Sequence, residues 1–71
     1  MKIRVKTEVP GIQWIDLAGD LDFHSSPQLR KEFGKLLEGE IQKLLVDLKK
    51  VSYIDSSGLA TFVELFQKMR E

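Results

Sequence analysis

Two adjacent hydroxyl side chains, flanked by an aspartate and a glycine, are the most chemically promising feature of this 71-residue sequence. Asp55, Ser56, Ser57 and Gly58 follow an apolar run and precede apolar residues at helical spacing. At the start of a helix, side-chain oxygens accept hydrogen bonds from the first free backbone N–H groups. An anion such as phosphate is also favoured there. The turn therefore predicts either a helix cap or a site for a phosphate.

Residue chemistry alone favours the cap, with one of the two serines as the N-cap and Gly58 allowing a tight turn. The functional alternative is a regulated phosphoacceptor. A phosphate adds up to two negative charges, which the helix N-terminus tolerates. Asp55 beside it would repel that phosphate, and so would an acidic partner surface.

Enzymatic and metal chemistry find less support. A serine at a strand-to-helix turn resembles a nucleophile elbow, but the G-x-S-x-G pattern is absent and the single histidine, His24, lies in a separate loop. Asp20, Asp22 and Asp55 could form a carboxylate cluster at one end of a sheet, although turn hydrogen bonding is the preferred interpretation. No acid and base are paired at a workable spacing, so we expect no enzyme activity. The sequence has no cysteine and therefore no thiolate metal site, and we expect no metal site of another kind and no cofactor.

Composition excludes further classes of function. Eleven basic residues balance eleven acidic ones, so nothing favours nucleic-acid binding. No apolar run approaches the ~20 residues of a membrane-spanning helix, so we expect no membrane insertion. The alternating N-terminus is unlike a signal peptide, and we expect a cytoplasmic protein.

The elements that must position the turn are three strands and two helices. Residues 1–9 and 12–18 alternate between apolar and polar types around Pro10-Gly11, which predicts a β-hairpin. A buried strand is predicted at residues 43–48, with Lys49-Lys50 as its solvated end. Residues 51–54 then lead into the turn. Strand, helix and strand in this order indicate a parallel pair with a right-handed crossover.

The helices show apolar residues at helical spacing. The first begins near Ser25, which has capping-box spacing to Gln28. Its core stripe is Leu29, Phe33, Leu36 and Leu37, and that of the second helix is Phe62, Val63, Phe66 and Met69. The fold class is therefore α/β: a mixed sheet, made of an N-terminal hairpin plus a parallel strand, packed with α-helices. Such a sheet has an open edge, so a homodimer, a domain-swapped assembly or a truncated domain all remain open.

Three segments together resemble the STAS domain family of sulfate transporters and anti-sigma factor antagonists. Residues 53–59, Tyr-Ile-Asp-Ser-Ser-Gly-Leu, are similar to the family signature. Residues 18–22 resemble its Gly-acid-Leu-Asp segment after the second strand. Residues 45–48, followed by Val51-Ser52, resemble the strand that precedes the signature.

This resemblance implies a switch protein in a bacterial partner-switching pathway. Its partner would be an anti-sigma factor that is also a serine kinase, which phosphorylates Ser56 and so breaks the complex. A metal-dependent phosphatase of the PP2C type would restore the complex. The resemblance further implies a partner-binding surface at Asp22, Asp55, Ser56, Ser57 and Gly58.

Two alternatives stay open beside the switch. A STAS subunit of an ABC-type lipid or solute transporter would dock on its ATPase and use the same turn structurally, without phosphorylation. Family domains also continue beyond the helix after the signature, with another strand and at least one helix. Residues 1–71 are therefore expected to form a single STAS domain that lacks these last elements.

Overall fold

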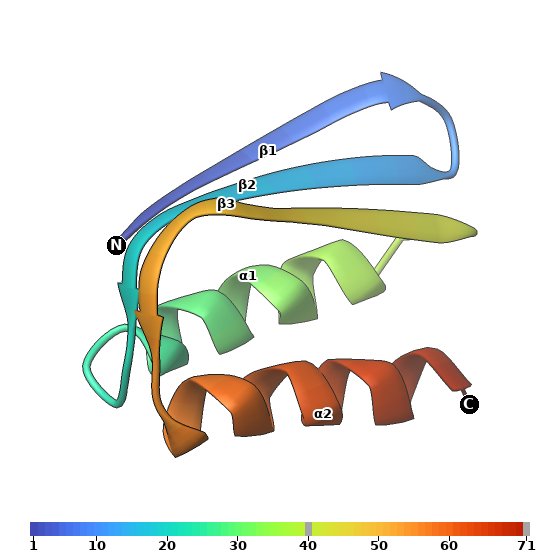
Figure 1. The fold of residues 1–71 in the computed structure, drawn as a ribbon. Coiled ribbons are helices and arrows are strands. Elements are labelled where there is room, and N and C mark those ends of the chain that lie inside the picture. The colour runs from blue at the N-terminus through green and yellow to red at the C-terminus, as the bar shows by residue number, and fades with distance from the viewer. Residues whose placement is uncertain (40, 71) are drawn as a thin grey trace.

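The computed structural model describes residues 1–39 and 41–70. The elements in chain order are β1 (Lys2–Val9), β2 (Ile12–Leu21), α1 (Ser26–Leu37), β3 (Lys43–Ile54) and α2 (Ser56–Arg70). The three strands form one sheet in the order β1-β2-β3, and both helices cover the same face of it (Figure 1). The predicted mixed α/β fold is confirmed.

The sheet is mixed because its two connections differ. β1 and β2 pair antiparallel around Pro10-Gly11, where Gly11 adopts a φ of 84° that favours glycine. β2 and β3 pair parallel, with α1 as the crossover between them. Both helices consequently begin at the end of the sheet where β2 and β3 finish (Figure 1).

β2 and β3 are longer than the sequence pattern predicts. β2 continues through Gly19, at a φ of 103°, to Leu21. β3 is one strand, so Lys49-Lys50 lies inside it and the prediction of a strand end there is wrong. The β2–β3 register shifts twice, first between Asp16 and Ala18 and again immediately after Gly19. Such bulges bend strands, and β2 and β3 bend together toward the helices (Figure 1).

The hydrophobic core lies between the sheet and the two helices. β2 supplies most of the sheet side, since it is the central strand, and α1 contributes the predicted Leu29 and Phe33. The buried apolar residues are Ile15, Leu17, Leu21, Leu29, Phe33, Phe62 and Leu65. Leu36 and Leu37, also predicted for the core, are partly buried against this cluster.

The predicted core stripe of α2 is wrong in most of its members. The side chains of Val63 and Phe66 are 46% and 60% exposed, and Met69 is also exposed. The buried face of α2 consists of Gly58, Thr61, Phe62 and Leu65. Leu59 adds to the exposed apolar side at 60%, so α2 carries apolar residues on a face that no other described element covers.

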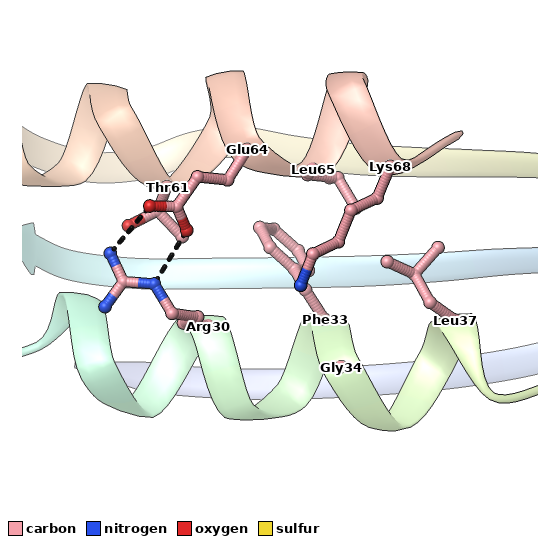
Figure 2. Close-up of a pocket in the computed structure, with 8 residues that line it drawn as sticks. All are labelled: Arg30, Phe33, Gly34, Leu37, Thr61, Glu64, Leu65 and Lys68. Atoms are coloured by element: carbon pink, nitrogen blue, oxygen red, sulfur yellow. Dashed lines mark hydrogen bonds and ion pairs between the residues drawn. The ribbon is translucent and has the colours of Figure 1, made fainter. Parts of the chain in front are cut away.

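The two helices lie side by side and are joined on their solvent-facing side (Figure 2). Nε of Arg30 donates to Oε2 of Glu64 at 2.8 Å, and a second guanidinium nitrogen lies 3.4 Å from Oε1. The rings of Phe33 in α1 and Phe62 in α2 also contact each other, with their centroids 5.8 Å apart. In the residues that the structure describes, no helix is long and apolar enough to cross a membrane.

Candidate functional site

Two turns meet at the carboxyl ends of β2 and β3. One turn, residues 22–25, leads from β2 into α1, and the other leads from β3 through Asp55 into α2. Leu21 and Ile54 are register partners, so the two turns begin side by side. The structure thereby brings Asp22 close to residues 55–58, which lie more than 30 positions later in the sequence.

Asp55 links the two turns through both carboxylate oxygens. Its Oδ1 accepts the backbone N–H of Gly58 at 3.0 Å, and its Oδ2 accepts the backbone N–H of Phe23 at 3.2 Å. Its own N–H donates to the carbonyl oxygen of Leu21 at 3.1 Å. Asp55 is therefore the N-cap of α2, and the prediction that a serine caps this helix is wrong.

Ser56 and Ser57 occupy the first turn of α2 instead. Ser56 is exposed, and its hydroxyl group makes no hydrogen bond to any of residues 1–39 or 41–70. Ser57 is half-buried, and its carbonyl oxygen accepts the hydroxyl of the buried Thr61 at 3.0 Å. Of the two hydroxyls, that of Ser56 is the one presented to solvent.

Gly58 is buried against the end of β2 and leaves no room for a side chain. A Cβ atom there would lie 2.6 Å from both Cγ and the carbonyl oxygen of Leu21, and 3.2 Å from Cγ2 of Ile54. Glycine at this position therefore allows α2 to start directly against the sheet. The tight-turn role predicted for Gly58 is in fact a close-packing role.

Asp22 organises the other turn. Its Oδ1 accepts the backbone N–H groups of His24 at 2.9 Å and Ser25 at 3.1 Å. The Ser25 amide hydrogen bond is the main cause that lowers the pKa of Asp22, with a further contribution from the His24 amide, although partial burial opposes the shift. Asp22 therefore remains a carboxylate that is committed to its own turn.

Ser25 does not form the predicted capping box. It occupies the N-cap position of α1 but makes no side-chain capping bond. Its hydroxyl instead donates to the carbonyl oxygen of Asp20 at 2.7 Å. The hydroxyl therefore bonds to the preceding strand and not to the helix. It can do so because β2 continues to Leu21, which places the carbonyl oxygen of Asp20 within reach.

Phe23 is a surface residue of this site that the sequence interpretation missed. Its side chain is 65% exposed, and its ring lies 4.1 Å from that of His24 between centroids. The available signal was a large aromatic residue inside an otherwise polar turn. Its backbone N–H donates to Asp55, so Phe23 lies in the turn next to the start of α2.

Among the described residues, no group of three acidic or histidine side chains is placed to hold a metal ion.

Comparison with known proteins adds to this geometry. The family model of the STAS domain matches residues 4–71. The anti-sigma-B factor antagonist of Bacillus subtilis (strain 168) is 37% identical over 71 residues, which cover all of this chain and 63% of that protein. The protein of the same name from Listeria monocytogenes is 33% identical over 75 residues, covering all of this chain and 64% of its own length. The chain thus spans less than two thirds of the length of these relatives.

Solved structures show the same fold. The anti-sigma factor antagonist SpoIIAA in its unphosphorylated form superposes with a TM-score of 0.80 at 20% identity, over 97% of this chain and 64% of that one. An anti-sigma factor antagonist from Mycobacterium paratuberculosis gives a TM-score of 0.86 at 22% identity, over 94% and 56% of the two chains. All four of these proteins are named as anti-sigma factor antagonists.

Proposed function

This chain belongs to the STAS domain family, and from that premise we propose that it acts as an anti-sigma factor antagonist controlled by phosphorylation of Ser56. Its partner is a cytoplasmic anti-sigma factor with serine kinase activity. The unmodified chain binds this partner, and the modified chain does not. The names of its curated relatives support the first part of the proposal, and the geometry around Ser56 supports the second.

The observation that carries the proposal is the placement of the Ser56 hydroxyl. It is exposed and without a hydrogen bond to the described residues, in the first turn of a helix whose start Asp55 fixes. The turn that carries Asp22 and Phe23 lies beside it and is tied to the same aspartate. A kinase that docks on both turns would therefore meet a hydroxyl that is free to react and held in place.

The proposed chemistry is a phosphoryl transfer in which this chain is the substrate. The Ser56 oxygen attacks the γ-phosphorus of ATP held by the kinase, the bond to the bridging oxygen breaks, ADP leaves and the hydroxyl proton is lost. The partner supplies ATP and its metal ion. A PP2C-type phosphatase reverses the change by hydrolysis, which returns the Ser56 hydroxyl and releases inorganic phosphate.

Charge and desolvation explain why the modified chain would release its partner. Phosphoserine carries about −1.5 to −2 charges at neutral pH, next to the carboxylate of Asp55 and on the surface shared with Asp22. Burial of that dianion at an interface is unfavourable unless cations pair with it. A coupling of ~1–3 kcal/mol would weaken binding by roughly 5–150-fold. Asp22, Asp55, Ser57 and Gly58 would shape the bound surface around Ser56.

Intact-mass spectrometry tests the proposal. The chain is incubated with ATP and the anti-sigma factor kinase of a related bacterium, beside the variants Ser56→Ala and Ser57→Ala. We expect one added phosphate in the wild type and in Ser57→Ala, and none in Ser56→Ala. A phosphate that persists in Ser56→Ala would refute the assignment of the site. No phosphate with any cognate kinase would refute the switch and favour the transporter-subunit alternative, in which the turn is structural.

A further inference from the structure

Both carboxylate oxygens of Asp55 are engaged by backbone N–H groups of the chain itself. Oδ1 accepts from Gly58 and so caps α2, and Oδ2 accepts from Phe23 in the turn of residues 22–25. Oxygens that are occupied in this way are less available to a partner protein. Asp55 is therefore better suited to act on recognition through the residues that it holds than by direct contact.

The bond from Phe23 to Asp55 connects two turns that are each held by bonds of their own. The turn of residues 22–25 is closed by the carboxylate of Asp22, which accepts the backbone N–H groups of His24 and Ser25. The start of α2 is closed by the cap from Asp55 to Gly58. The second oxygen of Asp55 therefore fixes the position of the first turn relative to the helix that carries Ser56.

We propose that Asp55 is a positioning residue for the kinase, because its bond to Phe23 holds residues 22–25 in the orientation that a kinase bound at Ser56 recognises. This inference rests on the proposed function, since it concerns the same kinase and the same serine. Without the bond, the turn has to be ordered when the kinase binds, and this ordering costs conformational entropy. The loss therefore raises KM and leaves kcat unchanged.

Asp55→Asn removes the bond at nearly constant side-chain size. Asparagine is as good an N-cap as aspartate, but its side chain has one acceptor oxygen and one NH₂ group in place of two oxygens. When the oxygen accepts from Gly58 and keeps the cap, a donor faces the N–H of Phe23 and the bridge is lost. Charge alone predicts the opposite effect on the reaction, because one carboxylate fewer beside Ser56 favours the approach of the phosphates of ATP.

The test is the initial rate of phosphate transfer to Ser56 over a range of chain concentrations, with the same kinase as in the mass-spectrometry experiment. We expect Asp55→Asn to raise KM about five- to tenfold, the effect of one lost hydrogen bond to a carboxylate, and to leave kcat within about twofold. Asp20→Asn is the matched control, because it makes the same charge change in an exposed side chain that takes no part in the bridge. It should leave KM unchanged.

A second variant removes the same bond from the other turn. Proline has no N–H, and position 23 is the second residue of the turn that the Ser25 N–H and the Asp22 carbonyl oxygen close at 3.2 Å, where proline is favoured. Phe23→Pro also removes the ring, so Phe23→Ala, which keeps the N–H, is its reference. KM of Phe23→Pro should exceed that of Phe23→Ala by the factor seen for Asp55→Asn. Adding Asp55→Asn to Phe23→Pro should have no further effect, whereas adding it to Phe23→Ala should have its full effect.

Circular dichroism at the assay temperature shows which variants are folded, and the comparison of Phe23→Pro with Phe23→Ala stands even if Asp55→Asn is not. Equal KM values for Asp55→Asn and the wild type would overturn this inference and leave the proposed switch intact. So would equal KM values for Phe23→Pro and Phe23→Ala, because the effect would then not pass through the Phe23 N–H. A fall in kcat alone would place Asp55 in the chemistry and overturn the positioning role. A wild type that takes no phosphate would overturn the proposed function together with this inference.

Discussion

Substitution of Gly58 by alanine tests the packing of the site most directly. Alanine is the better helix former by about 1 kcal/mol, so propensity alone predicts stabilisation. The structure predicts the opposite, because the new Cβ would lie 2.6 Å from the carbonyl oxygen of Leu21. The Leu21 side chain can rotate away, but this carbonyl is fixed by the Asp55 amide. Either the start of α2 or the end of β2 must shift.

The magnitude follows from the two opposing effects. Overpacking in a close-packed region typically costs 1–3 kcal/mol and sometimes more, against the gain of about 1 kcal/mol from propensity. We expect Gly58→Ala to lower the free energy of unfolding by about 1–2 kcal/mol. Gly34→Ala is the matched control, since Gly34 is also helical and a Cβ there meets nothing within 4 Å. It should raise the free energy of unfolding by about 0.5–1 kcal/mol.

Urea unfolding followed by circular dichroism measures both variants. For a protein of this size the m-value is about 1 kcal/mol per molar urea, so the two midpoints should move in opposite directions by roughly 1 M each. A Gly58→Ala variant as stable as the wild type would refute the close contact with Leu21. A destabilised Gly34→Ala would refute the assignment of open space on α1.

Three further predictions concern two individual side chains and one ion pair. The lowered pKa of Asp22 gives stability that is present above its unfolded pKa of about 3.9 and is lost as pH falls through the lower folded value. Below pH ~4 the melting temperature of Asp22→Asn should thus fall less steeply than that of the wild type, and parallel acid profiles would contradict this. A double-mutant cycle on Arg30→Ala and Glu64→Ala should give a coupling of about 0.5 kcal/mol that shrinks in high salt; a coupling unchanged by salt would show that the pair is not a screened surface ion pair. Phe23→Ala should change the free energy of unfolding by less than about 0.5 kcal/mol while weakening calorimetrically measured kinase binding about tenfold, and unchanged affinity would remove Phe23 from the partner surface.

Regular patterns in the sequence predicted most of the fold. Alternation on both sides of Pro10-Gly11 predicted the hairpin, and the spacing of Leu29 and Phe33 predicted the buried face of α1. The pattern failed where the β2–β3 register shifts, because β3 has one extra residue at each shift and each extra residue moves the following side chains of β3 to the other face of the sheet. Lys49-Lys50 therefore resembled a strand end, and Gly19, with its positive φ, resembled another, although both strands continue through these residues.

The sequence predicted the strand-to-helix turn at Ser56 but not the hydrogen bonds that hold it. Local spacing identified the turn at Ser56, since a strand, a polar turn and a helix follow each other there. Local spacing could not identify Asp55 as the N-cap. Asp55, Ser56 and Ser57 are all good N-cap residues, and the choice among them depends on which residue is the first in the helix. The hydrogen bond from Phe23 to Asp55 joins residues 32 positions apart, and no local pattern predicts such a contact.

That bond between the two turns has a consequence for the order of events during folding. It can form only after β2 and β3 have paired across the intervening helix, which closes a long loop and is a slow, non-local step. A nascent or partly folded chain carries Ser56 with the same sequence neighbours but lacks the joined turns. A kinase that recognises both turns together would leave such chains unmodified, so the phosphate would mark only molecules that have completed their fold.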